Sequence, residues 1–313
     1  MKKYTIIFLL TALVTTSLTG TIVLFSKFIQ KKASYYGSLE KYQFSKLSEK
    51  KNVDTIFVGD SSLGNAIDVK EFDAITGTHS INLALTGIYG YAGTYNLIKR
   101  ALRINPIKNV FIIHTLDIMK RPVDYRAFLL TAEKFYDDRI PFNIQKNIAI
   151  ALATEALDRK SVGGAFFPRT TGGNDKQKYV IANDYHPQEA PLSHRYSSNH
   201  FDNDTISPTI NAEQMAFLNL IGGLCHQQKI TCVYAFGPIL NKIHSNSDQM
   251  VKNSTAAIAA AGIPLADNTP YLLDFSELGD STDHVDPSRK THVTRYYANI
   301  LKRYITQHQT DAQ

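Results

Sequence analysis

Two polar segments near opposite ends of the 313-residue chain carry residue types that could form a nucleophilic catalytic site. The first is the Gly-Asp-Ser-Ser segment 59–62, which comes directly after the short apolar run 55–58. The second contains His284, shortly before the last amphipathic segment. A serine hydroxyl is a poor nucleophile at neutral pH and needs a base within hydrogen-bond reach. We therefore predict Ser61 as nucleophile and His284 as its base, although Asp and Ser in such a turn could only cap the next helix.

A third group must orient the imidazole, and two carboxylates precede His284 closely enough to do so. Asp280 lies four residues before the histidine, and Asp283 lies next to it. A turn can bring side chains four residues apart together, whereas neighbouring side chains rarely face the same way. We therefore favour Asp280 over Asp283. In the remaining interpretation, either aspartate only caps the helix after Pro287.

The Gly-Asp-Ser-Ser segment early in the chain and the histidine with its aspartates late in the chain resemble the motifs of the SGNH (GDSL-type) hydrolase family. The resemblance covers about residues 53–117 and 228–305. It implies a Ser-His-Asp site, with Ser61 and His284 in the first two roles. The family usually places the aspartate three residues before the histidine, where this chain has Ser281.

The resemblance also implies an oxyanion hole made of two backbone N–H groups and one asparagine side chain. The N–H groups belong to the serine and to a glycine after the second strand, which Gly87 matches by position. Gly87 could also only end that strand. At the asparagine position, after the third strand, stands Leu116. One expected donor is therefore missing, and Thr115 or a residue of the central insertion could replace it.

Strand and helix signals alternate along the chain. Apolar runs rich in β-branched and aromatic residues predict strands at 55–59, 80–85, 109–114 and 230–236, and helical spacing predicts helices at 88–103, 212–226, 247–261 and after Pro287. This alternation predicts right-handed crossovers and a mainly parallel sheet of about five strands. The expected fold class is α/β, a three-layer α/β/α sandwich of the SGNH, flavodoxin-like kind. Functional groups of such sheets gather beyond the carboxyl ends of the strands, where the segment 59–62 begins.

The alternation breaks between about residues 118 and 211. This stretch has one plausible helix around 144–157, little strand signal and many Gly, Asn, Asp, His and Tyr residues. We interpret it as an insertion over the active-site end of the sheet. Residues 33–52 are interpreted as a linker or a first amphipathic helix, so the SGNH-like domain is expected at 53–313.

The insertion contains two further groups that could bind ligands. The first is a set of histidines and aspartates, namely His186, His194, His200, Asp202 and Asp204. Their spacing lacks the signature of a strong metal motif, so we predict a polar surface loop with no metal and no cofactor. The second could offer aromatic and hydrogen-bonding surface to sugar rings, and consists of Tyr179, Tyr185, Tyr196 and the loop 169–173.

The N-terminal 32 residues predict a membrane anchor. Residues 4–25 carry no charge, are rich in Ile, Leu, Val and Phe, and have lysines on both sides. This segment is long enough to span a bilayer, whereas the apolar core of a cleaved signal peptide is usually shorter. Residues 1–32 also hold five of the six net positive charges. The remaining chain therefore does not predict a nucleic-acid-binding surface.

The only two cysteines are Cys225 and Cys232, at the end of a predicted helix and the start of the next strand. A disulfide between them is possible in an oxidising compartment. We favour two small buried thiols instead.

With a single-pass anchor before this domain, the chain resembles the extracytoplasmic partners of membrane-bound O-acyltransferases. The resemblance implies that Ser61 takes an acyl group, expected to be acetyl, and adds it to or removes it from a cell-envelope or exported polysaccharide. It places the domain on the periplasmic side of the bacterial inner membrane, with a polysaccharide, the lipid bilayer and a multispanning acyltransferase as partners. The alternatives are a membrane-tethered lipase or esterase, and a catalytically weak scaffold in an acylation complex.

Overall fold

The computed structural model describes residues 39–134, 136–161 and 191–310. The predicted anchor at 1–32 lies outside these ranges, as do the loop 169–173 and the side chains of Tyr179, Tyr185 and His186. Within the described ranges, no helix combines the length and the apolar character needed to cross a membrane.

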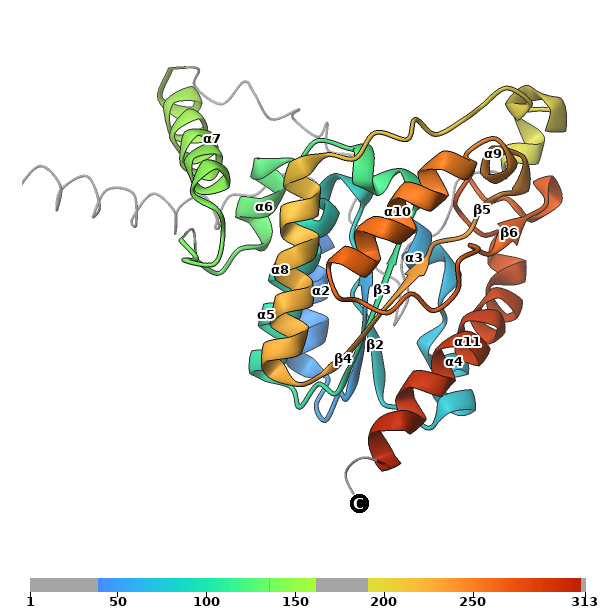
Figure 1. The fold of residues 1–313 in the computed structure, drawn as a ribbon, viewed down its shortest axis with the longest axis horizontal. Coiled ribbons are helices and arrows are strands. Elements are labelled where there is room, and N and C mark those ends of the chain that lie inside the picture. Colours follow the sequence, from blue (N-terminus) through green and yellow to red (C-terminus); the bar gives the residue numbers. More distant parts are fainter. Residues whose placement is uncertain (1–38, 135, 162–190, 311–313) are drawn as a thin grey trace, which may run out of the picture.

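A parallel sheet of four strands forms the centre of the domain (Figure 1). In spatial order the strands are β2 (Ser80–Asn82), β1 (Thr55–Gly59), β3 (Asn109–His114) and β4 (Thr231–Phe236). Every residue of β1 and β3 is buried, which fits their continuous runs of β-branched and aromatic residues. The order 2-1-3-4 reverses between β1 and β3. Open α/β sheets bind ligands at such a topological switch point.

The prediction of a mixed α/β fold with a mainly parallel sheet is confirmed, with differences at the two edges. The strand predicted at 80–85 is regular only in β2, although Leu85 N–H still donates to Gly59 O at 2.9 Å. At the other edge, the fifth strand is reduced to a parallel bridge between Tyr234 and Leu265. A separate two-stranded parallel sheet consists of β5 (Ile239–Leu240) and β6 (Leu272–Leu273).

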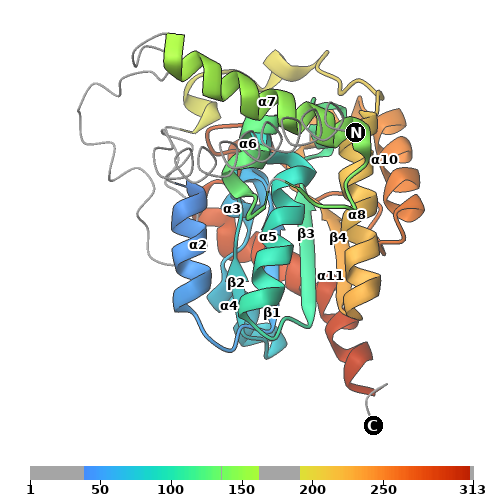
Figure 2. The same cartoon turned by 90° about the vertical axis from the view of Figure 1, so that its left-hand side faces the viewer.

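Helices lie on both sides of the main sheet (Figures 1 and 2). One side carries α5 (Gly90–Ile104) and α8 (Ala212–Gln228), and the other carries α4 (Val69–Thr76) and α11 (Lys290–Thr310). The other described helices are α2 (Leu39–Glu49), α3 (Ser61–Ala66), α6 (Tyr125–Thr131), α7 (Phe142–Ser161), α9 (Asn241–Ser245) and α10 (Asp248–Ala260), with 3₁₀ turns at Gly87–Tyr89, Leu116–Lys120, Leu192–His194, Ser198–Phe201, Phe275–Glu277 and Pro287–Arg289.

Residues 39–49 are part of the folded domain, which fits the interpretation of 33–52 as a first amphipathic helix, and not as a linker, for this portion. They form α2, whose Leu39 and Leu47 are buried. Gln43 Nε2 donates to Ala84 O at 2.6 Å, and Lys46 Nζ donates to Asn82 O. These bonds satisfy carbonyl groups at the open edge of the sheet, which would otherwise remain available for pairing with another chain.

The described parts of the insertion reach the histidine-bearing loop. Leu192 N–H donates to Gly279 O at 2.6 Å, and Arg195 Nη2 donates to Asp280 O at 2.8 Å. On the opposite side of the same end of the sheet, α6 and α7 extend away from the strands (Figure 1). The insertion therefore contacts the part of the domain that is predicted to be catalytic.

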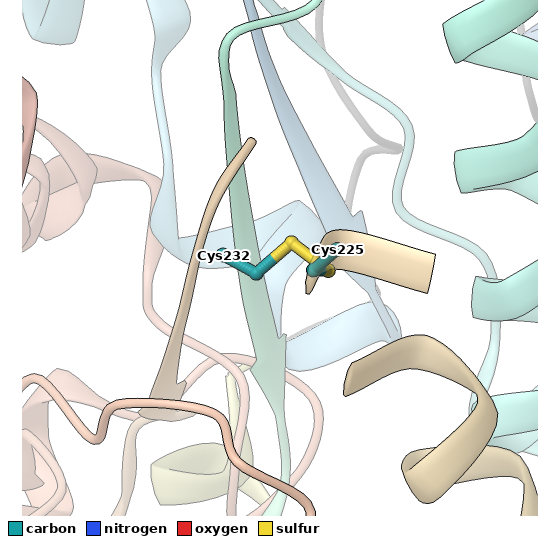
Figure 3. Close-up of a disulfide and its surroundings, with 2 residues drawn as sticks. All are labelled: Cys225 and Cys232. Atoms are coloured by element: carbon teal, nitrogen blue, oxygen red, sulfur yellow. A yellow bond between two sulfur atoms is a disulfide. The ribbon is translucent and has the colours of Figure 1, made fainter. Parts of the chain in front are cut away.

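The two cysteines form a disulfide, so the prediction of two thiols is wrong (Figure 3). Cys225 lies in the last turn of α8, and Lys229 ends this helix in the left-handed conformation with φ of 52°. This cap turns the chain back so that Cys232, on β4, lies 6.0 Å from Cys225 between Cα atoms. The distance is within the range that a disulfide requires.

Candidate functional site

The loops after β1, β2, β3 and β4 meet at one end of the sheet because the strands are parallel. The pairing of β1 with β3 places Gly59 opposite Ile113, so the next residues, Asp60 and His114, lie side by side. Gly237, after β4, donates its N–H to His114 O at 2.7 Å. The segment 59–62 therefore begins at the carboxyl end of β1, as its sequence predicted, and the strand order places it at the switch point of the sheet.

The Asp60 carboxylate joins two of the elements at this end, α3 and β3. It is the N-cap of α3, where its Oδ1 accepts from Ser62 N at 3.0 Å and from Ser62 Oγ at 2.6 Å. Its Oδ2 accepts from Thr115 N at 2.9 Å and lies 3.2 Å from His114 Nδ1. Only 1% of Asp60 is exposed. The carboxylate thereby ties the beginning of α3 to the end of β3.

These partners keep the buried carboxyl group ionised. Burial alone would raise the pKa of Asp60, because a charge is poorly solvated inside a protein. The hydrogen bond and charge of His114, with the bonds from Ser62 and Thr115, outweigh burial and lower the pKa to about 2. His114 is buried as well, and its Nε2 lies 2.9 Å from Thr94 Oγ1.

Ser61 is the first residue of α3 and is partly exposed above this buried layer. The hydrogen bond from Leu85 to Gly59 continues the register of β2 and β1, and two residues further the chains reach Gly87 and Ser61. In the part of the chain that the structure describes, neither the Ser61 N–H nor the Gly87 N–H has an acceptor. Both amides are free to bind an oxyanion.

His284 is partly exposed in the loop before α11 and lies between the two predicted aspartates. Its Nδ1 is 2.6 Å from Asp280 Oδ1, whereas its Nε2 is 3.8 Å from Asp283 Oδ1. Asp280 thus occupies the position of an orienting carboxylate, and Nε2 is left for a nucleophile or substrate. Ser61 Oγ makes no hydrogen bond to His284 within the described ranges. Such catalytic bonds are often long before substrate binds.

The carboxylates favour the imidazolium form of His284. Burial would lower the pKa of the imidazole, but the Asp283 charge and the hydrogen bond and charge of Asp280 outweigh it and raise the pKa. The charge of Asp60 adds to this effect, which links the histidine electrostatically to the carboxylate beside Ser61. The hydrogen bond with His284, in turn, lowers the pKa of Asp280.

The histidine loop is fixed to the helix that carries the serine. In α11, Lys290 Nζ donates to Gly64 O at 3.0 Å, and Thr294 Oγ1 donates to Ala66 O at 3.0 Å. Both carbonyl groups belong to α3. The first turns of α11 therefore hold His284 and Ser61 at the same end of the domain, although 223 positions separate them.

Thr115, a predicted replacement for the third oxyanion donor, and Leu116, at the position of the missing asparagine, come directly after β3. The N–H of Thr115 already donates to Asp60, so this backbone group is not available to an oxyanion. Leu116 has an apolar side chain that is 1% exposed. Leu116 therefore offers no side-chain donor in place of the asparagine of the resembled family, and the Thr115 hydroxyl stays a predicted donor.

Arg121 is a partly exposed site residue that the sequence interpretation missed. Its Nε and Nη2 donate to the two oxygens of Asp117 at 3.1 and 2.7 Å. Its Nη1 lies over Gly87, where a Cβ built on the glycine would be only 2.0 Å away. The acidic and basic residues four positions apart were the available signal, because such pairs commonly interact on one helical face.

An open groove begins at Gly87 and Arg121 and leads toward α6 and α7. It has a volume of about 650 Å³. Polar and apolar residues are mixed along it, with Pro122, Val123, Asp124 and Tyr125 coming after the arginine. This lining suits a substrate that is neither purely apolar nor purely charged.

Three of the other predicted ligand residues, Tyr196, His200 and Asp202, have partners of their own. Tyr196 is 42% exposed and stacks on His200, with 4.4 Å between ring centroids. Asp202 pairs with Lys242 at 3.4 Å. Within the described ranges, no three His, Cys, Asp or Glu side chains are arranged to hold a metal ion. Tyr196 remains a candidate aromatic surface for a sugar ring.

No protein-family model, no curated protein and no solved structure matches the chain.

Because Asp60 is buried and charged, its removal is expected to destabilise the domain. We expect Asp60→Asn to lower the free energy of unfolding by roughly 3–5 kcal/mol at pH 7, since the partners of the carboxylate lose its charge. Asp68→Asn is the matched control, because Asp68 caps α4 from a partly exposed position, and it should cost about 1 kcal/mol. Denaturant unfolding measures both.

The stabilising effect of Asp60 should also depend on pH. A carboxyl group with a lowered folded-state pKa stabilises the fold above its unfolded pKa of about 3.9 and loses this effect as the pH falls toward the folded value. The difference between wild type and Asp60→Asn should therefore shrink between pH 5 and the folded pKa of about 2. An unchanged difference at low pH would contradict the assigned ionisation.

Proposed function

We propose that the domain is a three-layer α/β/α sandwich of the SGNH type and that it is a serine acyltransferase or esterase. The observation that carries the proposal is the convergence of one partly exposed serine, two backbone N–H groups without an acceptor among the described residues, and a histidine–aspartate pair. The serine begins α3, the amides belong to Ser61 and Gly87, and Asp280 holds His284 Nδ1 at 2.6 Å. These groups supply nucleophile, oxyanion donors, base and orienting carboxylate.

The proposed reaction proceeds through an acyl-enzyme. Ser61 Oγ attacks the acyl carbonyl carbon while His284 Nε2 takes the hydroxyl proton, and the π electron pair moves to the carbonyl oxygen. The N–H groups of Ser61 and Gly87 bind this oxyanion. Collapse restores the C=O bond and expels the leaving alkoxide, which receives the proton from His284. A polymer hydroxyl or water then attacks the ester in the same way and regenerates Ser61.

The proposed location is the periplasmic face of the bacterial inner membrane. The uncharged segment 4–25 supports a single-pass anchor, and the Cys225–Cys232 disulfide supports an oxidising compartment. An anchored active site suits an acyl acceptor that is made or exported at the membrane. We therefore propose an envelope or exported polysaccharide as substrate, acetyl as the acyl group, and a multispanning acyltransferase as partner.

The alternative activities make different demands on the site. A membrane-tethered lipase needs an apolar channel for an acyl chain, whereas the groove beside Gly87 contains Arg121, Asp124 and Tyr125. The charged side chains of this lining suit a polar acceptor, although Ile88, Pro122 and Val123 add apolar surface. A scaffold protein needs no activated serine, whereas the ordered Asp280–His284 pair favours an enzyme.

The two aspartates should have separable effects on activity. In Asp280→Asn, kcat for a chromogenic acetyl ester is expected to fall roughly 10³- to 10⁴-fold, because the imidazole loses the acceptor that fixes its tautomer. In Asp283→Asn, kcat at the alkaline plateau should remain within about tenfold of wild type. The reason is that Asp283 Oδ1 lies 3.8 Å from His284 Nε2, which is too far for a hydrogen bond.

The pH profile provides the second readout of the same variants. The base must be neutral, so activity is lost as the pH falls through the pKa of His284. The Asp283 charge raises this pKa, so Asp283→Asn should move the acidic limb of kcat/KM to lower pH. A larger loss of kcat in Asp283→Asn than in Asp280→Asn would reverse the two roles.

The biological reaction is tested by substituting Ser61→Ala in the chromosome and measuring base-labile acetyl on each isolated envelope polysaccharide. A transferase predicts that one polymer loses its acetyl groups, and an esterase predicts that one gains them. The matched control is Ser48→Ala, an exposed serine of α2. Unchanged acetylation of every polymer in the Ser61→Ala strain would exclude the proposed substrate class.

A further inference from the structure

The oxyanion hole of the proposed enzyme has two backbone donors and lacks a side-chain donor at the position of the family's asparagine. Leu116 is apolar and buried, and the Thr115 N–H is already bonded to Asp60. A tetrahedral oxyanion carries a full negative charge, so a third donor at this position would contribute strongly to catalysis. A polar group beside Gly87 could supply this third donor.

The guanidinium of Arg121 is the polar group that lies on Gly87. The close approach is possible because residue 87 has no side chain, since a Cβ there would meet Nη1 at 2.0 Å and Cζ at 3.1 Å. Both Gly87 and Arg121 line the beginning of the groove. Nη1 therefore lies next to one of the two backbone donors, on the side open to a substrate.

Asp117 fixes the orientation of this guanidinium. It accepts from Nε and Nη2, so one edge of the planar fork is bound and the Nη1 end points away from the carboxylate. Within the described chain, Nη1 has no hydrogen-bond acceptor of its own. The side chain is thus preorganised, and its Nη1 group remains available to a substrate.

Charges beside both the proposed nucleophile and the proposed base act on Arg121. Burial would lower the pKa of the guanidinium, but Asp117 raises it, and the charges of Asp60 and Asp283 add to this effect. Asp60 directly precedes Ser61, and Asp283 directly precedes His284. The arginine is therefore a fixed cation within electrostatic reach of both sides of the site.

We propose that Arg121 Nη1 is the third oxyanion donor, in the place that an asparagine side chain occupies in the resembled family. The inference rests on the proposed acyl transfer at Ser61. When Oγ attacks, the carbonyl oxygen gains negative charge and accepts from Arg121 as well as from the Ser61 and Gly87 amides. Arg121 contacts the acyl oxygen in the acyl-enzyme again when the acceptor hydroxyl attacks. Asp117 acts as a positioning residue through Arg121.

The test compares steady-state hydrolysis of p-nitrophenyl acetate by the full chain and by four variants. In Arg121→Gln, kcat should fall roughly 10²- to 10³-fold with KM nearly unchanged, because the lost interaction forms only in the transition state. Arg121→Lys should recover only part of this loss, since one ammonium cannot bind Asp117 through two donors and also reach the oxyanion. Its kcat should stay at least about tenfold below wild type.

Two further variants separate the inference from its alternatives. Arg295→Gln removes an exposed arginine–carboxylate pair with Glu71, which joins α11 to α4, and should leave kcat unchanged. Ser61→Ala should abolish hydrolysis. Full hydrolysis by Ser61→Ala would overturn the proposed function itself.

Wild-type kcat in Arg121→Gln, with hydrolysis abolished in Ser61→Ala, would overturn the role of Arg121 alone. A purely structural role predicts that Arg121→Gln lowers the melting temperature without changing kcat of the folded fraction. If Arg121→Gln does not fold, Arg121→Lys decides the matter, and wild-type kcat in that variant overturns the inference.

Discussion

The Asp60 carboxylate is the constraint on which the rest of the site depends. It is buried, charged and bonded at once to the first turn of α3 and to the end of β3. An isolated buried charge would be very costly, so the carboxylate is stable only while His114, Thr115 and Ser62 remain in place. The same bonds hold the backbone at the switch point of the sheet. These buried bonds therefore fix the position of Ser61, which is partly exposed above them.

The site therefore has a buried lower layer and a partly exposed upper layer. The lower layer satisfies its own polar groups, and Ser61, Gly87 and His284 in the upper layer are partly exposed. Burial and the charges of Asp283 and Asp60 raise the pKa of Asp117, and the Arg121 charge only partly offsets this effect. Arg121 is therefore a cation that partly neutralises the negative charges of Asp117, Asp60 and Asp283. Such a balance suits the oxyanion of the proposed acyl transfer.

Local patterns in the sequence were enough to predict the central strands and the histidine–aspartate pair. The strands β1 and β3 are continuous apolar runs, and His284 with Asp280 four residues before it can be recognised within one short segment. Features that depend on tertiary contacts were not predictable in this way. Arg121 matters because Gly87 from another loop lies under it, and the disulfide forms because Lys229 turns the chain. The helix α2 belongs to the domain because Gln43 and Lys46 meet carbonyl groups of the sheet edge.

The central claim is that Ser61 is an activated nucleophile, and covalent labelling tests it most directly. The folded protein is treated with a fluorophosphonate, digested, and the modified peptide is sequenced by mass spectrometry. A single adduct on Ser61 is expected, and His284→Ala should suppress it because the serine then lacks its base. Ser62 is an internal control, since its hydroxyl is buried and donates to Asp60. An unlabelled folded protein, an adduct on another serine, or full labelling in His284→Ala would contradict the account.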